Sequence, residues 1–240
     1  MHQVIGEVSV RLRQQDGLVD EKRWSPQLHV DAFRSVVPWR TFRWWHGQRH
    51  YSGTYWSSTM HGHVIYESRL ELTRLLYADF APETKGVLAQ PFLLAADVAG
   101  KTCQHIPDFL ILRDSDVPLV VDVKPRRLLG RPKVAFSFGW MKEVVESRGW
   151  EFQVWCEPPD VELTNVRFLA GYRRDWLFDP ELIAEICGTD LDGATLGDAF
   201  RAFPHHRPEL VRAAVLHLLW RQHLPSLSAL GETPRFVGLA

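Results

Sequence analysis

Two aspartates and a lysine lie where short apolar segments of the chain begin or end, and this combination could bind a divalent cation. Asp108 follows Pro107 and precedes the apolar residues 109–112, whereas Asp122 and Lys124 lie at the end of the apolar segment 119–124. Charged groups on apolar strands are costly unless a partner compensates them. Pro-Asp or Asp-x-Lys alone carries little information, so the prediction depends on their combination.

The predicted pairing of these segments brings the two aspartates together. Residues 114–116 predict a tight turn, and a hairpin centred on Ser115 places Asp108 directly opposite Asp122. Directly paired residues have Cβ atoms about 4.5–5.5 Å apart on one face of a sheet. Because side chains alternate, Lys124 shares this face. The opposite face carries Phe109, Ile111, Val121 and Val123. A slip of one residue would separate the aspartates.

Two carboxylates this close favour a bound cation. Like charges at such a distance repel each other, and a positive ion between them removes the repulsion. Mg²⁺ prefers oxygen ligands, typically one or two carboxylates completed by water or phosphate. We therefore expect Mg²⁺ at Asp108 and Asp122, and we expect Mn²⁺ to substitute for it.

Three further polar residues are predicted to approach the same place. Glu67 lies in a predicted helix over residues 66–80, and Glu71 follows one turn later on the same face. One glutamate is expected to complete the metal ligands while the other orients them or pairs with Arg74. Gln90, which precedes a proline, is expected to contact phosphate or to orient a ligand. A surface role for Glu71 and a structural role for Gln90 are open alternatives.

Positive charge is unevenly distributed along the chain. The 28 lysines and arginines nearly balance 29 acidic residues, which argues against a protein that coats nucleic acid through uniform positive charge. Basic runs nevertheless occur within residues 34–50, 124–133 and 201–223. The residues predicted to contact DNA are Arg43, Arg126, Arg127, Arg131 and Lys133. A solvated surface is the ordinary role of any single run, so the prediction rests on their position around the acidic pair.

The first two thirds of the chain predict a mixed α/β fold. Residues 1–56 have the alternating and aromatic patterns of β-strands. Beyond the helix at 66–80, the pattern predicts a strand over 87–95 that Pro91 interrupts and strands within 103–113 and 118–123. A helix at 137–148 and a strand at 151–156 follow. The strand that follows the second helix should pair in parallel with the strand before that helix. A helical connection carries the chain back to the end of the sheet where the first strand started, so both strands run in the same direction.

The last third has a different pattern. Residues 165–172 predict a strand, and three short helices are predicted at 180–187, 195–203 and 208–224, with a possible hairpin at 236–239. Three helices and a hairpin are typical of a winged-helix domain, and a helical cap on the core is the alternative. We predict three regions: a β-rich extension over 1–56, a catalytic domain over 57–174 and a small helical domain over 175–240.

Composition narrows the class of protein further. The three cysteines are far apart and form no CxxC pair, so neither a disulfide framework nor a zinc knuckle is expected. The histidines at 61 and 63, and at 205 and 206, have no third ligand close in sequence, and surface roles are favoured. No apolar stretch reaches membrane-spanning length and no signal pattern is found at the first residues, so we expect a cytoplasmic protein without a membrane partner.

Five segments in order resemble the PD-(D/E)xK nuclease superfamily and, more closely, the TnsA family of endonuclease subunits of heteromeric transposases. They are YESRLE, AQPF, HIPDFLILR, VVDVKP and SRGWEFQVW, within residues 62–157. The resemblance implies a restriction-endonuclease-like core, a mixed sheet flanked by helices. It also implies catalytic roles for Glu67, Asp108 and Lys124, and a metal ligand in the backbone carbonyl of Val123. Asp122 occupies a position that is often Glu or Gln in the family.

The resemblance also implies a reaction and partners. The expected reaction is Mg²⁺-dependent hydrolysis of phosphodiester bonds in double-stranded DNA, with cleavage at the 5′ ends of a mobile element. A DDE-type transposase subunit would cut and join the 3′ ends, and an AAA+ ATPase would regulate both. The alternatives are a stand-alone restriction-like or defence nuclease and a non-catalytic module that docks DNA or protein.

Overall fold

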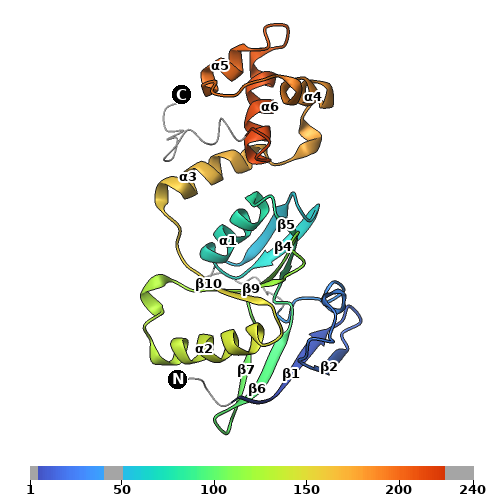
Figure 1. Ribbon diagram of the computed structural model, residues 1–240, viewed down its shortest axis with the longest axis vertical. Coiled ribbons are helices and arrows are strands. Elements are labelled where there is room, and N and C mark those ends of the chain that lie inside the picture. The colour runs from blue at the N-terminus through green and yellow to red at the C-terminus, as the bar shows by residue number, and fades with distance from the viewer. Residues whose placement is uncertain (1–4, 41–50, 225–240) are drawn as a thin grey trace. The chain divides into compact units, whose positions relative to one another are not determined.

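The computed structural model describes residues 5–40 and 51–224, which form a mixed α/β protein. The chain divides into two compact units (Figure 1). Unit 1 contains Met1–Ala78 and Glu83–Glu157, and unit 2 contains Asp79–Pro82 and Pro158–Ala240. The N-terminal strands thus belong to the same unit as the candidate site, and this division differs from the boundaries predicted at 56 and 174.

One sheet of unit 1 is built around the predicted β-rich N-terminal segment. Its four strands pair antiparallel in the order β2-β1-β6-β7. They are β1 (Ile5–Arg13), β2 (Val19–Arg23), β6 (Leu93–Val98) and β7 (Lys101–His105). The β-rich character predicted for the N-terminal residues is confirmed for those that the structure describes.

The second sheet carries the acidic residues, in the strand order β10-β9-β8-β5. Its strands are β5 (Thr84–Ala89), β8 (Phe109–Arg113), β9 (Leu119–Val123) and β10 (Glu151–Trp155). Strand β9 pairs antiparallel with β8 and parallel with β10, so the predicted parallel pairing after the second helix is confirmed. A separate antiparallel pair joins β3 (Gly53–Ser57) to β4 (Gly62–Tyr66).

The chain crosses between the two four-stranded sheets at two prolines. The predicted strand at 87–95 is two strands, β5 and β6, separated at Pro91, and the predicted strand at 103–113 is β7 and β8, separated at Pro107. Proline has no amide hydrogen to donate to a strand ladder, so pairing stops there and the chain can change sheets. The interruption at Pro91 was predicted from the sequence, whereas the prediction of one continuous strand over 103–113 was wrong because pairing stops at Pro107.

Helix α1 (Arg69–Phe80) begins later than the sequence pattern predicted, and residue 66 instead ends β4. The amide of Glu71 donates to Ser68 Oγ at 3.2 Å, and Ser68 Oγ donates to Glu71 Oε1 at 2.8 Å. A serine followed three residues later by glutamate is a capping signal, and it places the helix start after Ser68. Glu67 therefore precedes the helix, which corrects its predicted position within it.

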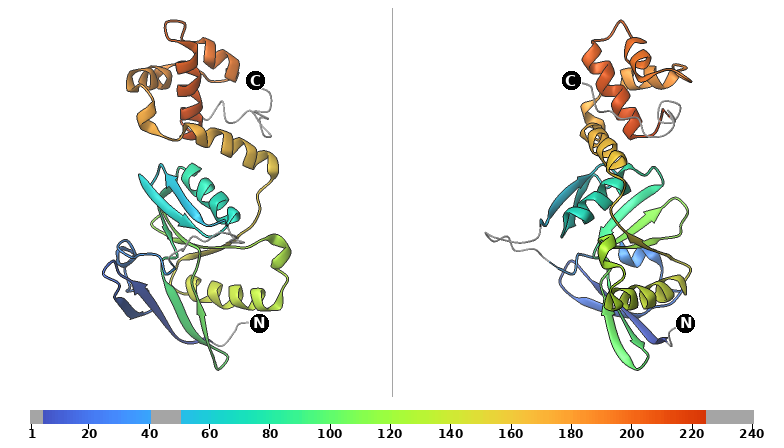
Figure 2. Two further views of the ribbon diagram at one scale, coloured as in Figure 1. Left: turned by 180° about the vertical axis from the view of Figure 1, so that it is seen from behind. Right: turned by 90° about the vertical axis from the view of Figure 1, so that its left-hand side faces the viewer.

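Helices α1 and α2 (Pro132–Glu146) cover opposite faces of the second sheet. Trp140 of α2 belongs to the same buried cluster as Val120 of β9. Tyr77 of α1 packs on Trp155, which pairs with Val123. Residues 120 and 123 of one strand face opposite sides because side chains alternate. Figure 2 shows α2, in yellow-green, beside the green strands β6 and β7, where it packs on both sheets.

Unit 2 is helical in the part that the structure describes. It contains α3 (Asp160–Leu169), α4 (Pro180–Gly188), α5 (Leu196–Arg201) and α6 (Pro208–Trp220). The three helices predicted after residue 180 are confirmed. The strand predicted at 165–172 is wrong, because Val166, Leu169 and Ala170 are buried at helical rather than alternating spacing. The hairpin predicted at 236–239 lies outside the described residues. No described helix is both long and apolar enough to cross a membrane.

Candidate active site

The register of the β8–β9 hairpin is the one that the turn signal predicted. Phe109 pairs with Val121, and Ile111 pairs with Leu119. Continuing this register by one position sets Asp108 opposite Asp122, at the end of the hairpin away from the turn. The two aspartates therefore lie side by side at the edge where β8 begins and β9 ends.

The Asp108 side chain extends the pairing of the two strands. Its Oδ2 accepts a hydrogen bond from the Val123 amide at 2.6 Å. A carboxylate oxygen is thus the acceptor where a backbone carbonyl of the neighbouring strand would otherwise be. Asp108 is half-buried, and its backbone oxygen accepts a hydrogen bond from the Gln90 amide at 2.9 Å. The carboxylate is held by backbone on a neighbouring strand, which gives it a defined direction.

Electrostatics couples Asp108 to the neighbouring charges. Burial raises the pKa of the Asp108 carboxyl well above its usual range, and the Asp122 and Glu71 carboxylates raise it further. The hydrogen bond from Val123 and the positive charge of Lys124 oppose this increase. Lys124 is half-buried next to β9. The site therefore contains more negative charge than its neighbours neutralise, as expected for a place that binds a cation.

Asp122 has a partner that the sequence analysis did not assign. It is buried, with 3% of its surface exposed, and both of its carboxylate oxygens lie close to His105 Nε2, at 2.8 and 2.9 Å. His105 ends β7 in the other sheet. The histidine stands in the HIPD segment, three residues before Asp108. This position next to Asp108 was the only hint in the sequence that His105 belongs to the site. Its contact with Asp122 could not be predicted, because it depends on the change of sheet at Pro107.

Glu67 is held by groups other than the aspartates. Its Oε2 accepts a hydrogen bond from Arg40 Nη1 and its Oε1 accepts one from Gln90 Nε2, each at 2.8 Å. The Gln90 side chain also accepts from the Arg40 amide at 2.8 Å. The structure thus joins Glu67 to the Asp108 backbone through Gln90, and it directs the Glu67 carboxylate to Arg40. The sequence analysis placed Arg40 only in the basic run within residues 34–50 and did not predict its pairing with Glu67.

Gln90 is constrained in a way that favours a functional role. It is 5% exposed and has a backbone φ of 47°, a left-handed conformation that non-glycine residues rarely adopt. Such strain persists where the surrounding structure enforces it, and it is common at functional sites. The backbone and both ends of the side chain connect Asp108, Glu67 and Arg40.

Glu71 caps the start of α1. Its two oxygens accept from the Ser68 hydroxyl at 2.8 Å and from the Glu67 amide at 2.7 Å. Burial is the main cause that raises the pKa of Glu71. The expected pairing of a glutamate with Arg74 is not what orders that arginine, because Arg74 donates to Gln153 at 3.3 Å on the face under α1. Glu71 influences Asp108 through its charge.

The carboxylates that this site offers to a divalent cation are those of two residues, Asp108 and Asp122. Within residues 5–40 and 51–224, no group of three or more histidine, cysteine, aspartate or glutamate side chains could hold a metal ion. Asp108 and Asp122 remain as a pair of hard oxygen donors, and the charge of Asp122 raises the pKa of Asp108. Mg²⁺ is commonly held by one or two carboxylates, with water and substrate phosphate as the other ligands. The donor set fits Mg²⁺ or Mn²⁺ better than a softer metal.

The predicted DNA contacts follow directly after Lys124. Arg126 and Arg127 are exposed on a short 3₁₀ helix (Arg126–Leu128), Arg131 is the exposed N-cap of α2, and Lys133 is exposed on its first turn. Glu157 faces this segment, and its pKa is lowered by hydrogen bonds that include one from the Arg126 amide and by the charges of both arginines. Arg43 lies outside the described residues.

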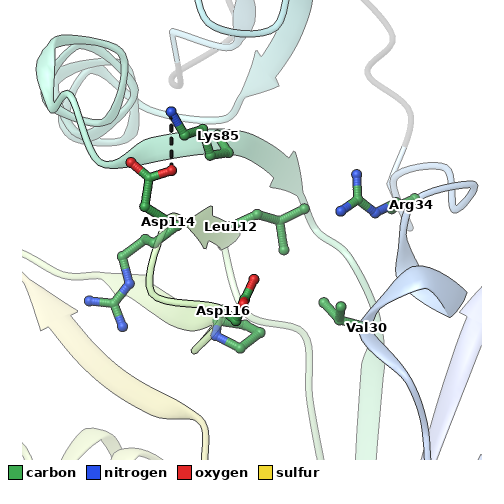
Figure 3. Close-up of a pocket in the computed structure, with 8 residues that line it drawn as sticks. Val30, Arg34, Lys85, Leu112, Asp114 and Asp116 are labelled. Carbon is green, nitrogen blue, oxygen red and sulfur yellow. Dashed lines mark ion pairs between the residues drawn. The ribbon is translucent and has the colours of Figure 1, made fainter.

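A groove elsewhere in unit 1 contains none of these residues. It is lined by Val30, Arg34, Lys85, Leu112, Arg113, Asp114, Asp116 and Pro118 (Figure 3). Lys85 forms an ion pair with Asp114 at 3.1 Å, and Arg34 pairs with Asp31 at 2.8 Å. Its positive charges are thus matched by acids, which is typical of a solvated surface.

Comparisons with known proteins assign no family to the chain. No protein-family model matches it, and no match is found among curated proteins. The functional assignment below therefore depends on the geometry of unit 1 and on the residue pattern that predicted it.

Proposed function

We propose that this chain is a metal-dependent DNA endonuclease with a restriction-endonuclease-like core. One observation carries the proposal: Asp108 and Asp122 lie side by side at the ends of paired strands, with Lys124 within electrostatic range of Asp108. A buried and a half-buried carboxylate of like charge beside a lysine are expected where a cation and a phosphate bind. The exposed arginines 126 and 127 follow this cluster in the chain.

Asp108 and Asp122 would hold Mg²⁺ or Mn²⁺, with the Val123 carbonyl as the further ligand that the resemblance implies. When bound, the cation would supply Lewis acidity toward water and charge stabilisation toward the phosphate. Lys124 would orient the attacking water or neutralise negative charge that develops on the phosphate in the transition state. Glu67 and Gln90 would position Asp108, since Gln90 joins the Glu67 carboxylate to the Asp108 backbone.

We further propose that the enzyme is the subunit of a heteromeric transposase that cleaves the 5′ ends of a mobile element. The support is the ordered set of segments within residues 62–157 that resembles the TnsA family. On this proposal the partners are double-stranded DNA, a DDE-type transposase subunit and an AAA+ ATPase. The helices of unit 2, proposed as a winged-helix-like domain, would dock DNA or one of these proteins.

Nicking of supercoiled plasmid tests the nuclease proposal. The wild-type chain should convert plasmid to the nicked form in Mg²⁺ or Mn²⁺, and the Asp108→Ala variant should not. Asp114→Ala is the matched control, because this aspartate is exposed on the same hairpin and only its surface ion pair is lost. Ca²⁺ should permit DNA binding and suppress cleavage, because it enforces ligand geometry less tightly. Equal cleavage by wild type and Asp108→Ala would refute the site.

The transposase role needs a separate experiment. The reaction is repeated with DNA that carries the ends of a candidate element, in the presence and absence of a transposase encoded beside this chain. A transposase subunit should cut at the element's 5′ ends only when the partner is present. A stand-alone nuclease should cut equally well without the partner and without element ends, and that result would reject the transposase role while leaving the nuclease site intact.

A further inference from the structure

His105 occupies a defined position between the two sheets of unit 1. Its Nε2 faces the Asp122 carboxylate at 2.8 and 2.9 Å, and its Nδ1 lies 3.3 Å from the hydroxyl oxygen of Ser137 on α2. The edges of Trp140 and Phe138, also on α2, confine the ring, with centroids at 6.3 and 6.4 Å. Contacts from β9 and α2 thus determine the orientation of this imidazole, which stands at the end of β7.

The hydrogen-bond chemistry follows from the carboxylate. An ionised carboxylate only accepts hydrogen bonds, so His105 Nε2 must carry the proton and donate it to Asp122. In the neutral ring Nδ1 is then an acceptor, which the Ser137 hydroxyl can satisfy. A carboxylate offers about four acceptor positions, so one shared N–H leaves further positions of Asp122 open to a cation.

We infer that His105 is a positioning residue for the proposed metal site: it holds Asp122 in the orientation in which that carboxylate lies beside Asp108. This inference rests on the proposed function. Asp122 is buried among apolar residues of β9, so the imidazole supplies the polar contact that keeps its carboxylate in one rotamer. Groups that orient metal ligands through hydrogen bonds strengthen metal binding, and their loss typically lowers affinity or activity about 10–100-fold.

Metal affinity of the full chain tests the inference without relying on cleavage. Mn²⁺ is titrated into wild type and variants, and free Mn²⁺ is measured by electron paramagnetic resonance. His105→Ala should weaken Mn²⁺ binding about 10–100-fold, the range for lost orienting groups. His105→Gln should recover most of the affinity, because its amide nitrogen can occupy the place of Nε2 and donate to Asp122. The matched control, His63→Ala, removes an exposed histidine of β4 and should bind as wild type does.

Nuclear magnetic resonance of the metal-free protein reads out the hydrogen bond itself. The ring nitrogens of His105 should show a proton on Nε2, and the signals should shift in Asp122→Asn and in Ser137→Ala. His105→Ala that binds Mn²⁺ as tightly as wild type, or a ring that carries its proton on Nδ1, would overturn the inference and leave the nuclease proposal standing. A wild-type chain that binds no Mn²⁺ would instead overturn the metal site, and the inference with it.

Discussion

Two regions of unit 1 bury charge in opposite ways. The Arg148 guanidinium lies over the rings of Trp24 and Trp150, at 4.4 and 4.1 Å from their centroids, and donates to the Leu28 carbonyl. Burial lowers its pKa to about 10. In the other region, the Asp108 carboxyl lies close to Asp122 and Glu71, and the negative charges of both raise its pKa.

On the proposed function, this is the difference between a structural charge and a charge that binds a cation. The negative faces of two indole rings attract the arginine and offset part of the cost of burying it, although burial still lowers its pKa. The aspartates are placed beside groups of the same sign, and such an arrangement destabilises the protein without a bound cation. A fold retains this cost where the charges serve binding or catalysis. Substitutions in the two regions should therefore have opposite effects on stability and on cleavage.

Lys124→Ala should lower the cleavage rate strongly while the protein stays folded. Removing a positive group that stabilises transition-state charge is expected to lower the cleavage rate about 100–1,000-fold. The strand pairing should persist, because the Lys124 contact to the Trp155 carbonyl is made by the backbone amide at 2.9 Å. Single-turnover plasmid cleavage and thermal unfolding are measured together. Lys142→Ala, an exposed lysine on α2 that forms only a surface pair with Glu146, is the control. Full activity in Lys124→Ala would remove this residue from the site.

Arg148→Ala should show the reverse pattern. The substitution leaves a space between Trp24 and Trp150 and removes the cation over both rings, so unfolding should become easier by about 2–4 kcal/mol. Cleavage by the fraction that stays folded should be unchanged. Urea unfolding gives the free energy, and Arg148→Lys, which keeps the charge but not the planar stacking, should lose less. A loss of cleavage without a loss of stability would contradict the structural role of Arg148 and the difference between the two regions.

Local signals predicted the hairpin that carries the site. The turn at 114–116 and the alternation of apolar residues on either side were sufficient to predict the register that places Asp108 opposite Asp122. The parallel position of β10 followed from the helix that precedes it. Both predictions concern residues close in sequence or joined by one standard connection, for which few alternatives compete.

Contacts between distant segments could not be predicted in this way. Glu67 is held by Arg40, which lies 27 residues before it in the chain, and Asp122 is held by His105 from another sheet. Both contacts depend on where the chain changes sheets, and a proline shows that a ladder is interrupted without showing where the chain goes next. The start of α1 was different: the capping signal of Ser68 and Glu71 was present in the sequence and was overlooked.

Asp108→Asn should increase stability while it abolishes cleavage. The pKa of Asp108 is raised in the folded protein, so the folded state binds the proton more tightly than the unfolded chain does. Stability therefore falls as pH rises from the usual aspartate range through the folded pKa. Asparagine carries no charge and keeps an oxygen for the Val123 amide. Its advantage over wild type should grow with pH and reach about 1 kcal/mol, a common gain when a functional residue is replaced.

Urea unfolding without divalent cations, at about pH 5 and about pH 8, measures this effect. Asp114→Asn is the matched control, since this aspartate is exposed on the same hairpin. Adding Mn²⁺ should stabilise wild type and not Asp108→Asn, because an ion that binds only the folded state shifts the equilibrium toward it. A wild type that is more stable than Asp108→Asn at both pH values would show that contacts within the fold offset the charge of the Asp108 carboxylate.

Arg127→Gln should have the smallest effect. It tests whether the exposed arginines that follow Lys124 contact DNA. Arg127 is exposed and follows Lys124 by three residues. A cation that neutralises one phosphate releases about 0.9 of a counterion, so its loss should reduce the slope of log affinity against log salt by about 0.9. Fluorescence anisotropy in Ca²⁺ measures this slope, with Arg23→Gln, an exposed arginine on β2, as the control. An unchanged slope would show that Arg127 does not contact a DNA phosphate. The pair of Asp108 and Asp122 would then lack the adjacent phosphate contact that distinguishes a nuclease site from an isolated cation site.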